Sequence, residues 1–212
     1  MVHVFYYRIS SRLPATNFNA YLQTMPVAIQ KRITAYRHWE DAERSLAGYL
    51  LLQKSVNLIK GAPADLDELK HGDFSKPYFK NDVYFNISHS GKYTVCAVSE
   101  MHEVGIDIEL LNDIPVGDFT EFFEANEWSR VLNSPDPVKA FYMLWTKKEA
   151  FLKLIGSGLN VPLSQVIILD DNRIDWEGKQ YTLQQLHIDP VHLCHLCTSH
   201  PPKQVEMVAV TL

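Results

Sequence analysis

The sequence is poor in cysteine and has no long apolar run, and each absence excludes a class of protein. Three cysteines in 212 residues are few and odd in number, which argues against a disulfide framework and fits a reducing cytosol. No run of about eighteen apolar residues marks a membrane span. Residues 1–8 lack a basic leader and a small-residue cleavage site. We therefore expect a cytoplasmic protein without a membrane span.

An excess of basic charge is also missing. The 25 acidic side chains outnumber the 20 lysines and arginines, so the formal net charge is -5 at pH 7. General attraction to nucleic acid or to an anionic membrane is therefore not expected, and a phosphate ligand would need a local basic pocket. The pattern Gly-x-x-x-x-Gly-Lys-(Ser/Thr) is absent as well, which disfavours a P-loop enzyme.

The sequence does contain an ordered series of strand and helix signals. Runs of β-branched and aromatic residues predict strands, while Asp41 and Asp136 are suitable helix N-caps and Gly156 a suitable helix stop. We expect a strand over 2–9, a helix over 41–59, strands over 83–87, 93–99 and 104–109 with a turn at 88–91, helical residues over 119–132, a long helix up to Gly156, and mostly strand and turn from 166 to 212. This order predicts an α+β fold with a boundary near residue 102.

The segment 104–109, Val-Gly-Ile-Asp-Ile-Glu, places two carboxylates on one strand face. Strand side chains alternate, so Asp107 and Glu109 point one way and the apolar residues the other. Their mutual repulsion would be relieved by a cation, and hard cations such as Mg²⁺ prefer oxygen ligands. By itself the segment is better explained as a strand with a solvated acidic face, which is the commoner case.

Two further segments are weak signals when each is taken alone. In a helix over 145–153, Trp145, Glu149 and Lys153 share a face, either as a surface pair or as part of a buried site. In Phe-Asn-Ile-Ser-His-Ser-Gly, residues 85–91, Ser88 and His89 could contact a phosphate or could simply form a turn.

Together the three segments resemble the signature of the Sfp-type 4′-phosphopantetheinyl transferases. That family has an Asn-x-Ser-His-Ser turn, a Gly-Ile-Asp-x-Glu strand and a Trp-x-x-Lys-Glu-(Ala/Ser)-x-x-Lys helix, in the order found here. Residues 38–48 resemble the family's first-helix region. Residues 75–78 resemble its Gly-Lys-Pro element, with Ser75 in place of glycine. The resemblance extends from about residue 32 to residue 163 and is weak in the last fifty residues.

The resemblance implies an α+β fold of two similar α/β subdomains related by a pseudo-twofold axis. We expect an N-terminal subdomain over 1–102 and a C-terminal subdomain over 103–212, with the active site in the cleft between them. Since both halves lie in one chain, we expect a working monomer.

The resemblance also implies a set of site residues. Asp107, Glu109 and Glu149 would hold Mg²⁺ with the pyrophosphate of coenzyme A. Lys153 would contact the transferred phosphate and His89 the pyrophosphate, and these two with Glu149 form the expected catalytic group. The remaining residues expected to bind coenzyme A, near the adenosine and its 3′-phosphate, are Lys31, Arg32, Ser45, Lys76 and Ser88.

The implied reaction transfers 4′-phosphopantetheine from coenzyme A to a serine of an apo acyl or peptidyl carrier protein, and releases 3′,5′-ADP. Glu149 or a water on the metal would accept the serine proton. Phe122 and Phe123 are candidates for contact with the carrier, although aromatic residues are more often part of a core.

Three other interpretations are weaker. The histidines and cysteines over 187–200 suggest zinc, but they contain only half of a zinc pattern, Cys194-x-x-Cys197, on an expected strand. A binding module without chemistry would be expected to lack Asp107, Glu149 or Lys153. A third alternative is another Mg²⁺-dependent nucleotide enzyme, such as a pyrophosphatase, and an assay that separates hydrolysis of coenzyme A from transfer to a carrier would discriminate it.

Overall fold

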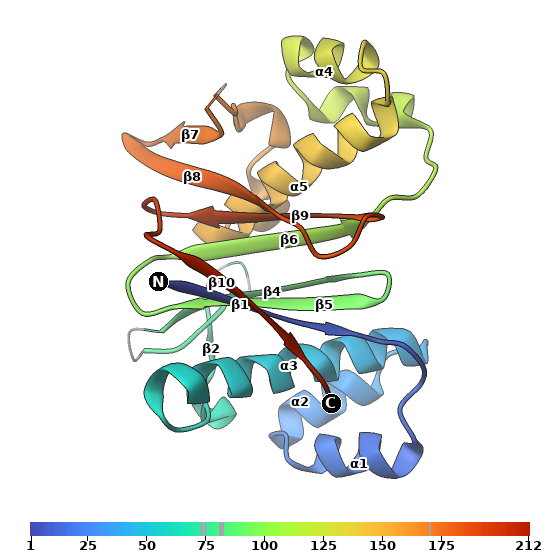
Figure 1. Ribbon diagram of the computed structural model, residues 1–212, viewed down its shortest axis with the longest axis vertical. Coiled ribbons are helices and arrows are strands. Elements are labelled where there is room, and N and C mark those ends of the chain that lie inside the picture. The colour runs from blue at the N-terminus through green and yellow to red at the C-terminus, as the bar shows by residue number, and fades with distance from the viewer. Residues whose placement is uncertain (73, 75, 81–82, 170) are drawn as a thin grey trace.

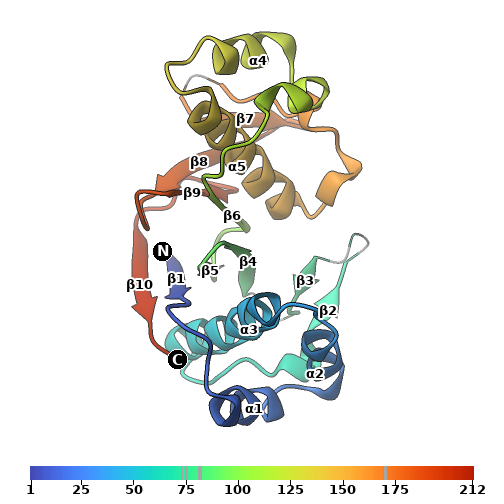
Figure 2. The same cartoon turned by 90° about the vertical axis from the view of Figure 1, so that its right-hand side faces the viewer.

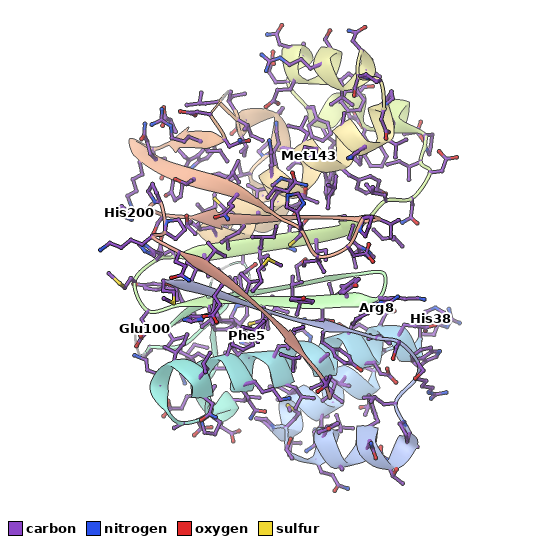
Figure 3. The ribbon with its side chains drawn as sticks, in the orientation of Figure 1. Phe5, Arg8, His38, Glu100, Met143 and His200 are labelled. Atoms are coloured by element: carbon purple, nitrogen blue, oxygen red, sulfur yellow. The ribbon has the colours of Figure 1, made fainter. Side chains whose placement is uncertain are left out.

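The computed structural model describes residues 1–72, 74, 76–80, 83–169 and 171–212. Two four-stranded sheets face each other, and helices cover the outer face of each, so that the layers run helix, sheet, sheet, helix (Figures 1 and 2). Side chains fill the space between the layers (Figure 3). No helix in the described ranges is long and apolar enough to cross a membrane. The predicted α+β class is confirmed.

The first sheet has the strand order β10-β1-β5-β4. Phe5 of β1 and Phe85 of β4 turn toward the helices and join a core under α3, which contributes Leu51 and Leu52. The strands are β1 (Val2–Arg8), β4 (Tyr84–Ser90), β5 (Tyr93–Ser99) and β10 (Val205–Val210), and the covering helices are α1 (Ala15–Gln23), α2 (Val27–Thr34) and α3 (Trp39–Lys60). A short 3₁₀ turn, η1 (Leu66–Glu68), and a small hairpin of β2 (Lys70–His71) and β3 (Pro77–Tyr78) connect α3 to β4.

The second sheet has the strand order β6-β9-β8-β7 and lies against α5. Phe151 of α5 is fully buried against Tyr181 of β8 and Trp176 of β7. The strands are β6 (Val104–Leu110), β7 (Arg173–Trp176), β8 (Lys179–Leu186) and β9 (His192–Thr198); the helices are α4 (Ala125–Leu132), α5 (Pro137–Ile155) and the 3₁₀ segments η2 (Val116–Phe122), η3 (Gly158–Asn160) and η4 (Leu163–Gln165).

A third apolar core lies between the two sheets. Val4 and Val95 from the first sheet pack with Ile106, Ile108 and Leu196 from the second, and all five are almost fully buried. Burial of such side chains contributes about 1.5–3 kcal/mol each. The two halves are therefore held together by an apolar core of their own.

The structure confirms α5 closely and corrects two local predictions. Asp136 accepts a hydrogen bond from the Lys139 amide and Gly156 ends α5 in the left-handed conformation, as expected. Asp41, predicted to cap the first long helix, lies inside α3 and instead pairs with Arg44 at 2.6 Å. The aromatic and acidic residues before it extend the helix to Trp39.

The second correction concerns residues 88–91, predicted as a turn. Ser88, His89 and Ser90 continue β4, and the chain reverses only at Gly91, where φ is 54°. Antiparallel pairing with β5 continues up to Ser90 opposite Tyr93, which places the three polar residues in an ordered strand.

The last strand crosses between the halves. β10 pairs in parallel with β1, with Val205 opposite Val2 and Val210 opposite Tyr7. The predicted second subdomain, 103–212, thus supplies an edge strand to the sheet of the first (Figure 1). Val205 and Met207 also pack on the core between the sheets, and this apolar contact helps to hold β10 beside β1.

Gly105 allows α5 to lie directly on β6. A Cβ at this position would be 2.0 Å from the Ala150 carbonyl oxygen and 2.5 Å from the Leu154 amide nitrogen, both of them backbone atoms. Only a residue without a side chain fits this close approach. The glycine therefore sets the distance between the strand that holds Asp107 and the helix that holds Glu149.

We predict that Gly105→Ala destabilises the fold by about 3 kcal/mol, because backbone atoms must move to admit the methyl group. The melting temperature should fall by about 10 °C in a thermal unfolding experiment. Gly117→Ala is the matched control, since a Cβ there meets nothing within 4 Å. Equal melting temperatures for the two variants would contradict the role given to Gly105.

Candidate active site

The candidate site lies where the edge strands of the two sheets meet. Three alternate side chains of β4 each accept a hydrogen bond from a backbone N–H of β6. The bonds join Ile106 N to Asn86 Oδ1 (3.0 Å), Ile108 N to Ser88 Oγ (3.4 Å) and Leu110 N to Ser90 Oγ (3.0 Å). The partner numbers rise together, so the two strands run in the same direction. We call these three bonds the seam ladder.

Asp107 sits in the seam under a lysine from α5. Its Oδ1 accepts hydrogen bonds from Ser88 Oγ at 3.0 Å and from Lys153 Nζ at 2.5 Å. Lys153 also donates to Ser88 Oγ at 2.8 Å. The aspartate is 2% exposed, and its second oxygen, Oδ2, is buried without a hydrogen-bond partner among the described residues. A buried carboxylate oxygen of this kind calls for a cation or a donor.

Glu109 lies two residues further along the same face of β6. Its Oε2 accepts a hydrogen bond from the Ser90 hydroxyl at 2.7 Å. Burial raises the pKa of Glu109, as does the neighbouring charge of Asp107, while Ser90 and Lys153 oppose the rise. The predicted alternation of β6 is thereby confirmed: the carboxylates face α5 while Ile106 and Ile108 enter the core between the sheets.

Glu149 completes the acidic group from the helix side. Burial raises its pKa most, followed by the charge of Asp107, and Lys153 acts in the opposite direction. A smaller effect from Glu109 also raises the pKa of Glu149, so both carboxylates of β6 act on the one from α5. One lysine ammonium thus faces three carboxyl groups, which leaves the site with a deficit of positive charge.

The group has the donor chemistry of a magnesium site but not a closed cage. In the described ranges, no set of three or more metal-ligating side chains is close enough to enclose an ion. Lys153 contacts the Asp107 oxygen that a cation would compete for. Mg²⁺ is commonly held by one or two carboxylates together with substrate phosphates and water. The buried Asp107 Oδ2 and the excess of carboxylates fit such a site.

The chain is similar to known proteins over most of its length. Residues 103–205 match the family described as 4′-phosphopantetheinyl transferase superfamily, and residues 14–101 match the family described as 4′-phosphopantetheinyl transferase, N-terminal. The chain is 32% identical to the 4′-phosphopantetheinyl transferase gsp of Aneurinibacillus migulanus over 77% of this chain and 70% of that protein. It is also 32% identical to a 4′-phosphopantetheinyl transferase of Bacillus subtilis over 82% of this chain and 83% of that protein.

The chain belongs to the 4′-phosphopantetheinyl transferase family. The family suggested by the motifs is thus confirmed, and the protein is a transferase that acts on carrier proteins. Identity to the Sfp transferase of Bacillus subtilis (strain 168) is 29% over 85% of each chain. Among solved structures, the holo-[acyl-carrier-protein] synthase of Thermotoga maritima aligns with 45% of this chain and 61% of its own, at 22% identity and a TM-score of 0.36.

His89 of the transferase is an exposed side chain of β4 near two cations. Partial loss of hydration lowers its pKa, and the charges of Arg44 and Lys153 lower it further. The imidazole is therefore neutral at neutral pH and can both donate and accept hydrogen bonds. Arg44, which sequence reasoning passed over, is fixed beside it by donating to the Gly91 carbonyl at 2.6 Å.

Two residues expected at the nucleotide have other partners in the structure. Ser88 is buried, and its hydroxyl is occupied by Asp107, Lys153 and the β6 backbone. Lys76 donates to the Leu154 carbonyl at 2.5 Å, where the C-terminal end of α5 attracts a cation. Burial lowers the pKa of Lys76. Ser75, which precedes it, lies outside the described residues.

The other expected nucleotide residues come from helices of the first half. Lys31 and Arg32 are exposed in the last turn of α2, whose buried residues, Ile29 and Ile33, face α3. Ser45 is half-buried on α3, next to Arg44. In the contacts described for the chain, none of the three touches the carboxylate group, so their roles remain predictions.

The histidines and cysteines over 187–200 do not gather around a point. Cys194 packs in the core between the sheets, whereas Cys197 packs under α5 on the opposite face of β9. His195 Nδ1 forms a 2.7 Å hydrogen bond with the hydroxyl of Thr146, and burial lowers the pKa of His195 to about 3. The strand alternation that argued against zinc is observed.

Sequence reasoning missed a buried ion pair behind the site. Lys148, the residue before Glu149, is fully buried and donates to Glu127 Oε2 at 2.5 Å and to the Leu163 carbonyl at 2.9 Å. Burial lowers the pKa of Lys148, and Glu127 opposes this. The pair ties α4 and the loop after α5 to the helix that presents Glu149. Its only sequence signal was the lysine of the family's helix motif.

We predict that Lys148→Met destabilises the transferase by about 3–5 kcal/mol, because Glu127 would remain buried without its partner. The double variant Lys148→Met with Glu127→Leu should recover most of this loss, since no unpaired charge remains. Urea unfolding of the single and double variants tests the coupling. A double variant no more stable than the single one would show that the pair is not the source of the loss.

We also predict that Glu149→Gln raises the melting temperature at pH 7 by about 2 °C while transfer activity is lost. The folded chain holds the Glu149 proton more tightly than the unfolded chain, so the associated stability is lost as pH rises through the raised pKa. The gain from glutamine should therefore vanish below about pH 4. Melting curves over this pH range test the explanation, with Glu177→Gln as the exposed control. A gain that does not depend on pH would refute it.

Proposed function

We propose that the transferase moves 4′-phosphopantetheine from coenzyme A to a serine of an apo acyl or peptidyl carrier protein, with Mg²⁺ as cofactor and 3′,5′-ADP as product. The observation that supports this most is the meeting of Asp107, Glu149 and Lys153 at the joint between the halves. A site between two halves can bind coenzyme A as the phosphopantetheine donor and still be open to the serine of a carrier protein.

Asp107, Glu109 and Glu149 would hold the magnesium ion together with the pyrophosphate of coenzyme A. When bound, the ion supplies positive charge that stabilises the phosphoryl oxygens and the leaving phosphate. The carboxyl groups suit this task because two come from one strand and the third from a helix set close to it by Gly105. His89, neutral and exposed, would bind the same pyrophosphate.

Lys153 would neutralise charge on the transferred phosphoryl group. Its ammonium lies at the end of a helix side chain and bridges Ser88 and Asp107. A lysine stem of four carbons lets the ammonium turn from the carboxylate toward a phosphate within the same space. Electrostatic stabilisation of this kind is the main source of catalysis in phosphoryl transfer.

Glu149 would accept the proton of the carrier serine. A water on the metal is the alternative acceptor, because a carboxylate bound to magnesium is a weaker base. The serine oxygen forms a bond to the phosphorus that carries pantetheine, and the bond from that phosphorus to the bridging oxygen breaks. The departing 3′,5′-ADP keeps that electron pair, and the serine proton passes to Glu149.

The adenosine would lie beside a pocket of about 480 Å³ lined by residues of both halves. Lys76 and Pro77 border it from the first half, and Ile155 and Gly156 follow Lys153 from the second. Lys31, Arg32 and Ser45 would serve the 3′-phosphate, and Ser88 would act through Asp107 and Lys153.

For the carrier protein we propose contact at Phe122 and not at Phe123. Phe122 is 45% exposed, whereas Phe123 is 6% exposed and stacks on Trp128 in the core. A local apolar contact suits a carrier of acidic character, because the enzyme is itself net negative. All proposed site residues come from one chain, which supports a working monomer.

The deciding experiment is intact-mass spectrometry of an apo carrier protein incubated with the enzyme, coenzyme A and magnesium. We expect a mass gain of one phosphopantetheine that disappears on chelation. We expect Glu149→Ala and Asp107→Ala to lower the rate at least about 10²-fold, as loss of a group that acts in the transition state does. Phe122→Ala should raise KM for the carrier and leave kcat nearly unchanged.

Carriers from fatty acid, polyketide and non-ribosomal peptide synthesis should all be tried. If none gains mass while 3′,5′-ADP is still released, the activity is hydrolysis of coenzyme A. If neither product forms, the chain is a binding module.

A further inference from the structure

The three side chains of the seam ladder differ in the hydrogen bonds that they make besides those to β6. Asn86, Ser88 and Ser90 each accept one hydrogen bond from an N–H of β6. The amide group of Asn86 bonds no carboxylate in the contacts described, whereas each of the two serines donates its hydroxyl proton to a carboxylate of β6. Ser88 donates to Asp107 and Ser90 donates to Glu109.

Ser90 is held by one hydrogen bond from β6 and donates another to Glu109. Its oxygen accepts from Leu110 N at 3.0 Å, so the hydroxyl cannot move far from β6. Its proton is then available to Glu109 Oε2 at 2.7 Å. The backbone of one half thus fixes a serine of the other half, and the serine fixes the carboxylate.

Glu109 has more need of such a partner than Asp107. It lies near the end of β6, is partly exposed, and has one more rotatable bond than an aspartate. Asp107 is nearly fully buried and contacts two donors, Ser88 and Lys153. Among the described residues, Ser90 is the one side chain that hydrogen-bonds Glu109.

We infer that Ser90 is a positioning residue that orients Glu109 toward the cation, whereas Asn86 serves only to join the halves. This inference rests on the proposed function, since it needs a metal at the carboxylates. Groups that orient metal ligands change metal affinity about 10–100-fold when removed. Loss of the Ser90 hydroxyl should therefore weaken Mg²⁺ binding but leave the rate of phosphopantetheine transfer unchanged once the metal is bound.

Asn86 provides the matched control. It contributes a hydrogen bond of the same length, 3.0 Å, to the same strand, but it donates to no carboxylate in the contacts described. Asn86→Ala and Ser90→Ala each remove one bond between the halves, so both should lower the melting temperature. Only Ser90→Ala also releases a metal ligand.

The test is calorimetric titration of Mg²⁺ into the full-length enzyme with coenzyme A present and no carrier protein. We expect Ser90→Ala to weaken Mg²⁺ binding about tenfold, Ser90→Thr to restore it, and Asn86→Ala to change it less than about twofold. In the transfer assay, Ser90→Ala should need more Mg²⁺ for half-maximal rate but reach nearly the wild-type kcat in excess metal.

Unchanged Mg²⁺ affinity in Ser90→Ala, or an equal loss in Asn86→Ala, would overturn the inference while the proposed function stands. Failure of the wild-type enzyme to bind Mg²⁺ with coenzyme A would overturn the metal site and this inference with it. If Asn86→Ala does not fold, the comparison of Ser90→Ala with Ser90→Thr decides, because threonine keeps the hydroxyl.

Discussion

The structure depends on the seam ladder, the hydrogen bonds by which side chains of β4 satisfy the N–H groups of β6. β6 is the edge of its sheet, and an edge strand leaves a row of backbone groups without strand partners. Here the other half supplies the acceptors from Asn86, Ser88 and Ser90. Since buried N–H groups are costly when unpaired, the position of β6 against β4 is closely defined. The positions of Asp107 and Glu109 are defined with it, because these residues alternate with the bonded residues along β6.

The same seam brings three carboxyl groups close together, an arrangement that does not stabilise the fold. The charge of Asp107 raises the pKa of both Glu109 and Glu149, and Lys153 acts in the opposite direction on each. The apolar core between the sheets and the close contact at Gly105 hold the carboxylates together despite their repulsion. Such a group is expected where a cation and an anionic substrate bind, since functional sites commonly sacrifice stability.

The sequence allowed prediction wherever a local rule decides the outcome. The limits of α5 followed from Asp136 and Gly156, and the faces of β6 followed from strand alternation. Motifs located Ser88 and Lys76 but not their partners, because Asp107 and Leu154 are distant in the chain. The pairing of Lys148 with Glu127 was invisible for the same reason: a lysine on a helix normally reaches solvent, and only tertiary packing buries it. The return of β10 to the first sheet likewise depends on long-range pairing.

These long-range contacts make the two halves one unit. A division after residue 102 would remove β10 from β1, expose the core between the sheets and leave the β6 edge without its acceptors. Each half has its own long helix and sheet, yet neither contains all the residues of the proposed site. His89 and the serines belong to β4, while the carboxylates and Lys153 belong to β6 and α5. Catalytic geometry and the joining of the halves therefore rest on the same few hydrogen bonds. Loss of Ser88 or Ser90 would affect both, because each serine also bonds a carboxylate, whereas loss of Asn86 would affect the joint alone.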